Sequence, residues 1–201
     1  GLTRLEIAYH RPAVKGRVIW GGLVPYGQTW RAGANEATTL TVTTDVTIAG
    51  KPVPKGSYAL FILPQKEHWT VILNKESKQW GAYFHKPEQD LLRFDVEPQP
   101  IPLQEYLTYR VDLRRRDTAL ISLAWEKLMI SFPVQAEVEA LYQAHLKEGL
   151  AKADGNPDKK AAASVYYVAA KYHLDAGRLT DAEPLLQKAI ALGETFRTCE
   201  L

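Results

Sequence analysis

The chain has 201 residues, of which 46% are hydrophobic and 24% charged, a balance typical of globular proteins that excludes disordered, collagen-like and disulfide-scaffold classes. This length fits one full domain and a small second unit. The formal net charge of +2, from 25 basic and 23 acidic residues, gives no reason to expect a nucleic-acid partner. The sequence also lacks an apolar run long enough to predict a membrane span.

The composition changes near Pro133. All five Trp and most of the Pro lie at or before this residue, whereas the later part is rich in Ala, Leu, Glu and Lys. We therefore predict a β-rich domain at residues 1–133 and a helical segment of about three helices at residues 134–201. The only cysteine, Cys199, cannot form an internal disulfide.

Short runs of strand type follow one another through the first part, bounded by Gly, Pro, Asn or charged turns. Strands this short, without intervening helices, favour an antiparallel β-sandwich of about nine strands, so that the fold class is mainly β. Pro52 and Pro54 do not suit a central strand, which predicts a turn or edge segment at 51–55. The strand-like runs are 5–9, 39–43, 57–63, 69–73, 92–96, 106–113, 119–125 and 128–132.

The second part has helical periodicity. Apolar residues recur at helical spacing from Gln135 to Ala153. Asn156 precedes Pro157 and is expected to cap a second helix that ends at Gly177. A capping-box pattern beginning at Thr180 predicts a third helix ending near Gly193.

Residues 163–196 resemble a single tetratricopeptide repeat, the helix pair that stacks into superhelical arrays. A lone repeat cannot bury its own apolar face and offers almost no concave surface, so a helical buttress is the simpler interpretation. The resemblance rests on Tyr166, Gly177, Leu179, Ala182 and Ala189, while His173 and Ala170 depart from the usual pattern.

Longer motifs in the first part resemble a bacterial family catalogued as domain of unknown function 2911. They are the segments 11–17, 22–27, 30–38, 45–48, 56–58, 69–72 and 80–83. The resemblance covers residues 2–133, although His10 and Ala32 stand where the family usually has Ser and Thr. It implies a secreted or periplasmic protein, because members commonly carry signal peptides, and it implies no activity. The present sequence shows no such leader at its start.

The segment Trp30–Thr38 contains the main candidates for a site. It brings Arg31, Asn35, Glu36 and Thr38 together with small residues that let the backbone approach a neighbour closely. One interpretation is a structural Arg31–Glu36 ion pair with Asn35 in an Asx turn. The other is the floor of a pocket, in which Arg31 holds an anionic or carbonyl group and the other two orient it.

Aromatic and basic residues extend this candidate site. Trp80 and Tyr83 follow a polar loop, and aromatic residues beside loops are better binding candidates than those inside strands. With Trp20, Trp30 and Trp69 they would form a platform for a sugar ring or another planar ligand. Core packing is the alternative for the tryptophans, above all for those inside strands. The candidate ligand-binding residues are Arg11, Trp30, Arg31, Asn35, Glu36, Thr38, Trp80 and Tyr83.

Other chemistry finds little support in the sequence. The five His show no metal-ligand spacing, and we expect no metal or cofactor. A nucleophile elbow is also missing from the sequence. Glu36, Asp90 and Glu126 are the carboxylates from which a glycoside hydrolase pair would have to come.

Three function hypotheses remain, and the sequence does not decide whether the protein is an enzyme. The first is a non-enzymatic binding protein of the bacterial envelope that takes a small molecule or glycan at Trp30–Thr38. The second is a hydrolase of sugar or peptide linkages with Glu36 as acid/base. The third is an interaction module whose helical tail docks a protein partner.

Overall fold

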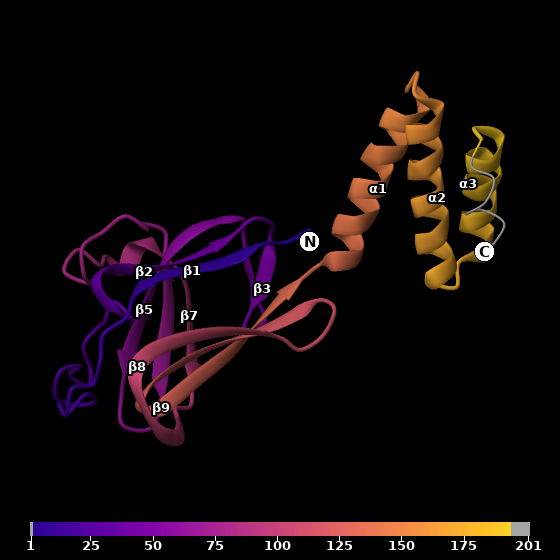
Figure 1. Cartoon of the computed structure of the whole chain (residues 1–201). Helices are drawn as coiled ribbons and strands as arrows, with labels where there is room; N and C mark the ends of the chain where they lie inside the picture. Colours follow the sequence, from indigo (N-terminus) through magenta and orange to yellow (C-terminus); the bar gives the residue numbers. More distant parts are fainter. Residues whose placement is uncertain (1, 194–201) are drawn as a thin grey trace. The chain divides into compact units, whose positions relative to one another are not determined.

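The computed structural model describes residues 2–193 and divides the chain into two compact units, Gly1–Val138 and Glu139–Leu201. The first unit contains the strands and the second the helices, as Figure 1 shows. Within the described residues the fold is mainly β, with two antiparallel sheets and three C-terminal helices, which confirms the predicted fold class. Cys199 and Phe196, which ends the predicted repeat, lie outside the described residues.

The first sheet of the described chain has five strands in the order β1-β2-β5-β6-β7, and each neighbouring pair is antiparallel. The central strand β5 and its neighbour β6 carry mostly buried side chains, because alternate apolar residues pack in the core with residues of the second sheet and the others form a smaller cluster with Ala37. The bounds are β1 Leu5–His10, β2 Ala34–Val42, β5 Gly56–Pro64, β6 Trp69–Asn74 and β7 Asp90–Val96.

The second sheet has four described strands in the order β4-β3-β9-β8. Pro52 lies in the edge strand β4, in agreement with the edge or turn expected there. The sequence pattern predicted that the last strand ends before Pro133, and the structure corrects this. β9 continues through Pro133 to Ala136. Proline is tolerated there because pairing with β3 begins only at Val134, so residue 133 needs no backbone N–H donor. The bounds are β3 Val46–Ile48, β4 Lys51–Val53, β8 Gln99–Leu113 and β9 Thr118–Ala136.

Four tryptophans form the centre of the core between the sheets. Trp20 lies 4.3 Å from Trp69, centroid to centroid, and Trp30 stacks on Trp125 at 5.8 Å. Trp69 and Trp125 are almost fully buried, and Trp30 is 8% exposed. Burial of aromatic rings contributes strongly to stability, so the packing of these rings is a main source of stability for the β unit.

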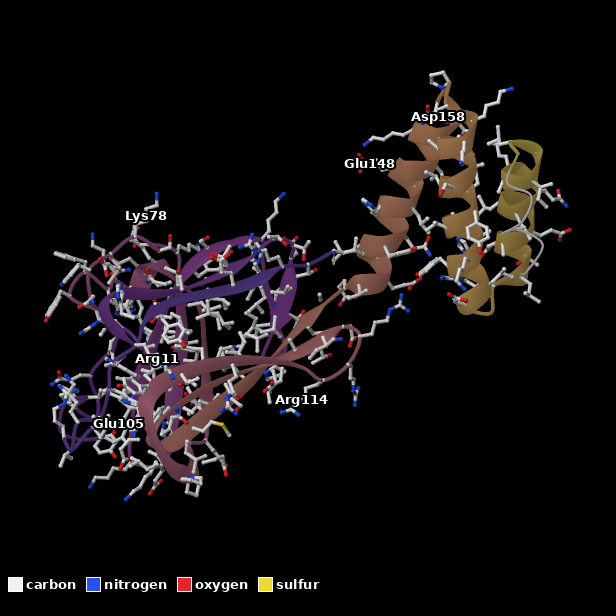
Figure 2. The ribbon with its side chains drawn as sticks, viewed as in Figure 1. Arg11, Lys78, Glu105, Arg114, Glu148 and Asp158 are labelled. Atoms are coloured by element: carbon white, nitrogen blue, oxygen red, sulfur yellow. The ribbon has the colours of Figure 1, made fainter. Side chains whose placement is uncertain are left out.

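The chain crosses from one sheet to the other directly after β1. Ala13 pairs with Tyr106 of β8, and the amide of Val14 donates to the carbonyl of Glu105 at 2.8 Å. Figure 2 shows Arg11 and Glu105 beside β8. This crossing carries the chain into the loop that holds Trp20 and Trp30.

The helical unit contains α1 (Val138–Asp154), α2 (Lys159–Asp175) and α3 (Leu179–Ala191). Asp158, rather than the expected Asn156, caps α2, and its side chain accepts from the amide of Ala161 at 3.1 Å. Asn156 instead accepts from the amide of Asp158 at 2.9 Å, which orders the turn before the helix. Gly177 follows α2 with φ 71°, as the predicted left-handed C-terminal cap requires.

Aromatic and small residues join the three helices. Tyr142 of α1 stacks on Tyr172 of α2 with centroids 3.9 Å apart. Ala182 and Ala189 of α3 are buried, and Ala189 packs with Ala162 and Tyr166 of α2, where a small side chain lets the helices approach. In the described part of the chain, no helix has both the length and the apolar character to cross a membrane.

Glu139 at the start of α1 links α1 to α2 through hydrogen bonds. Its carboxylate accepts hydrogen bonds from the hydroxyl of Tyr172, from Arg178 at 2.9 Å and from Gln143 at 3.2 Å. These bonds, led by that of Tyr172, lower the pKa of Glu139 from 4.5 to about 2. The carboxylate therefore stabilises the helical unit above about pH 4.5, and this contribution is lost as the pH falls towards 2.

We predict that Glu139→Gln lowers the melting temperature of the helices at pH 7, and that the difference from wild type shrinks as the pH falls from about 5 to 2. Circular dichroism at 222 nm reports the helices, and tryptophan fluorescence reports the β unit, which holds all five Trp. Equal helix melting of the two proteins at pH 7 would contradict the prediction.

Candidate functional site

The first half of the segment Trp30–Thr38 is fixed on the core. Trp30 exchanges two backbone hydrogen bonds with Ile62 of β5, at 2.7 and 2.9 Å. Ala32 is fully buried with φ 53°, and its carbonyl accepts from the hydroxyls of Thr38 at 3.0 Å and Tyr109 at 2.9 Å. A methyl group on Gly33 would come within 2.8 Å of the Thr38 hydroxyl, so this position needs glycine.

The second half of the segment departs from regular pairing with β1. Ala34 pairs with His10 of β1, but the next paired residues are Thr39 and Ala8, so residues 35–38 form an irregularity in the ladder between β1 and β2. Thr38 itself stays paired with Leu60 of β5. The amide of Ala37 instead donates to the carbonyl of Gln79 at 3.0 Å, and Glu36 pairs with Trp80. This departure turns the side chains of residues 35 and 36 away from the core.

The irregularity brings Asn35, His10 and Glu36 together. The imidazole Nε2 of His10 lies 2.6 Å from Oε2 of Glu36, and the amide nitrogen of Asn35 lies 3.2 Å from Nδ1. In this arrangement Nε2 donates to the carboxylate and Nδ1 accepts from the amide. The His10 and Glu36 side chains are 51% and 55% exposed, so the pair faces solvent.

A pocket of about 610 Å³ opens beside this pair, and we name it the His10–Glu36 pocket. One of its lining residues, Trp80, is 55% exposed, and another, Lys78, points outward in Figure 2. The lining residues are Ala8, Tyr9, His10, Glu36, Ala37, Thr39, Ser77, Lys78, Gln79 and Trp80.

Arg31 faces a different pocket, of about 520 Å³, which we name the Arg31 pocket. The Arg31–Glu36 ion pair considered from the sequence is therefore not formed, because Glu36 turns outward with the irregularity towards His10. Tyr83, 80% exposed, belongs to this second pocket. The lining residues are Leu23, Pro25, Gln28, Thr29, Trp30, Arg31, Ala82, Tyr83 and His85.

The predicted candidates thus divide between several places. Glu36 and Trp80 line the first pocket, with Asn35 bonded to His10 beside it. Trp30, Arg31 and Tyr83 line the second. The two remaining candidates, Arg11 and Thr38, bond to other parts of the β unit.

Arg11 and Thr38 lie outside both pockets. Arg11 donates to the carbonyl of Leu107 and to Thr108, each at 3.1 Å, and lies over the ring of Tyr106. These contacts hold the crossing segment on β8. Thr38 is fully buried, and its hydroxyl serves the carbonyl of Ala32.

The family described as "Protein of unknown function (DUF2911)" matches residues 1–134. The chain belongs to the DUF2911 family. Comparison with curated proteins found no match, and comparison with solved structures found none.

The sequence did not identify His10 as a site residue of this DUF2911 protein. In the sequence His10 is a departure from the family pattern and one of five His without metal-ligand spacing, at the end of the first strand. Strand pairing could have predicted the role of His10. If the first strand pairs with residues 34–42, the C-terminal end of that strand lies beside Asn35 and Glu36. The irregularity that turns these side chains outward has no such signal, because it depends on pairing with the distant Gln79.

The His10–Glu36 pocket is suited to holding polar groups. Both nitrogens of His10 are engaged, whereas the contact with His10 uses only one of the two carboxylate oxygens of Glu36. Of the described lining residues, Glu36 alone carries a carboxylate; Asp90 and Glu126 lie elsewhere. Within residues 2–193, no group of three or more His, Cys, Asp or Glu is arranged to hold a metal ion.

The placement of Thr38 yields a prediction on stability. Thr38→Val removes a buried hydrogen bond and should lower the free energy of unfolding of the β unit by about 1 kcal/mol, because the carbonyl of Ala32 keeps its bond from Tyr109. Thr41→Val on the same strand is the matched control. Its hydroxyl bonds that of Ser57 at the surface, so its effect should stay below about 0.5 kcal/mol.

Denaturant unfolding followed by tryptophan fluorescence measures both variants. If Thr38→Val weakened ligand binding without loss of stability, Thr38 would be a binding residue after all.

Proposed function

We propose that this protein is a non-enzymatic binding protein that takes a polyhydroxylated ligand, such as a sugar or a glycan end, in the His10–Glu36 pocket. The observation that carries the proposal is the Asn35–His10–Glu36 arrangement, held half-exposed beside a pocket that Trp80 also lines. The volume of about 610 Å³ is in the range of small-molecule sites.

The chemistry of the lining matches both faces of a sugar. The ring of Trp80 offers an apolar surface for the C–H face, as aromatic residues at wet sites commonly do. The free carboxylate oxygen of Glu36 accepts from a hydroxyl, and the bond from His10 fixes its position before the ligand arrives. Such preorganisation reduces the entropy lost on binding. Lys78 adds a donor to the wall.

The hydrolase hypothesis stays as the second candidate, because Glu36 is exposed on a pocket wall where a general acid or base has to be. Glycoside hydrolysis usually needs a second carboxylate, and none lines this pocket in the described residues. Formation of products from a bound oligosaccharide would favour this candidate over simple binding.

We also propose that α2 and α3 form a tetratricopeptide-like pair and that the protein is secreted or periplasmic. The buried positions of Tyr166, Ala182 and Ala189 support the helix pair.

Docking of a protein partner on the helices finds support in Leu179 and Ile190 of α3, which are exposed. The family supports the location, which fractionation of the producing cell would test.

We predict that Glu36→Gln lowers the affinity for a bound sugar by about tenfold, because a charge-assisted hydrogen bond contributes roughly 1.5–3 kcal/mol. Isothermal titration of the full chain against mono- and oligosaccharides measures this. Trp80→Ala should lose a similar factor through the lost stacking surface.

The control is Glu97→Gln, which makes the same chemical change at an exposed residue outside the pocket. Glu97→Gln should leave the affinity unchanged, and neither Glu variant should shift the melting temperature by more than about a degree, since surface substitutions change stability little. Equal sugar affinity of wild type, Glu36→Gln and Trp80→Ala would overturn the proposal.

A further inference from the structure

The Arg31 pocket holds a positive charge without a counter-charge. The Nε atom of Arg31 is buried and has no hydrogen-bond partner within residues 2–193. The Nη atoms are not among the buried unpartnered groups, so the end of the guanidinium keeps access to the pocket that Arg31 lines. A partly desolvated cation without a partner is costly, and a bound anion would remove that cost.

His85 lies on the same wall and is fixed from behind. Its Nε2 lies 2.9 Å from Oδ1 of Asp90, and the two side chains are only 8% and 6% exposed. Asp90 also accepts from the amide of Asn74 at 2.8 Å and from Nε of Arg93 at 2.6 Å. Both oxygens of the Asp90 carboxylate are therefore engaged inside the protein, and Nδ1 is the nitrogen of the His85 ring that remains for a ligand.

The rest of the lining carries hydrogen-bonding groups without negative charge. Gln28, Thr29 and Tyr83 supply amide and hydroxyl groups. No Asp or Glu belongs to the lining as far as the structure describes the chain, in contrast to the His10–Glu36 pocket. The two pockets thus differ in charge, although both are bounded by the segment 79–85.

We propose that the Arg31 pocket is a second binding site, one that takes an oxyanion group, phosphate or carboxylate, carried by a small molecule. The Nη groups of Arg31 supply the charge-assisted hydrogen bonds, which are the strong ones in such sites. His85, oriented by Asp90, and Tyr83 bound the anion on the other sides. This site is independent of the sugar site proposed above.

Nuclear magnetic resonance on the full chain tests the proposal with inorganic phosphate and, separately, acetate, each against sodium chloride of equal ionic strength. The reporters are the Nε–H of Arg31 and the indole N–H of Trp30, which lines the pocket and donates to Gly33 at 3.1 Å. We expect a saturable shift of both signals with at least one oxyanion and none with chloride. Phosphate alone or acetate alone would identify the source of the anion.

Arg31→Gln should abolish the saturable shift of Trp30. Arg114→Gln, at the exposed turn between β8 and β9, is the matched control and should retain it (Figure 2). Without anion, Arg31→Gln should not lower the stability of the β unit in fluorescence-monitored unfolding, because it removes an unpaired charge.

Absence of a saturable shift with both anions would overturn the proposal, and so would a shift that survives in Arg31→Gln. Glu36→Gln separates the two sites: it should weaken sugar binding and leave the phosphate or acetate response intact. Failure of one site therefore leaves the other testable.

Discussion

Both candidate pockets depend on one backbone carbonyl, that of Ala32. It accepts hydroxyl groups from Thr38 on β2 and Tyr109 on β8, which belong to the two different sheets. The bond from Tyr109 is fully buried, and burial is the main cause that raises the pKa of this tyrosine well above its ordinary value. The hydroxyl therefore stays protonated and able to donate. Because a buried carbonyl without partners is unfavourable, the loop has little freedom to move away from the core.

The fixed carbonyl of Ala32 lies between two residues that face different pockets. Arg31, on one side, faces a pocket bounded by neutral and basic residues, whereas Glu36, on the other side, faces a pocket with a carboxylate. A continuous β-strand would have alternated these side chains across one sheet. The irregularity in β2 instead turns Glu36 towards His10, so that the two opposite charges lie in separate pockets and do not neutralise one another.

Much of the fold followed from local patterns in the sequence. The mainly β class, the edge position of Pro52 and the glycine cap at Gly177 were all predicted from residue type and spacing. The candidate site was predicted only in part. Glu36 and Trp80 were recognised as candidates, but their assembly with His10 requires strand register and a bulge, which arise from contacts between distant segments. The tryptophans show the converse. Trp20, Trp30 and Trp69 were candidates for a binding platform, but their rings meet that of Trp125 between the sheets.

The crossing segment after β1 has a consequence for self-association. β8 is the last strand of its sheet, and a long edge strand offers unpaired backbone groups to another copy of the chain. Residues 12–14 occupy the middle of that edge through their bonds to Glu105 and Leu107. Beyond them, Arg110 and Asp112 are exposed, and charged edge residues oppose strand addition. The segment that carries the chain to the loop of Trp20 and Trp30 thus also shields the middle of this sheet edge from pairing with another copy of the chain.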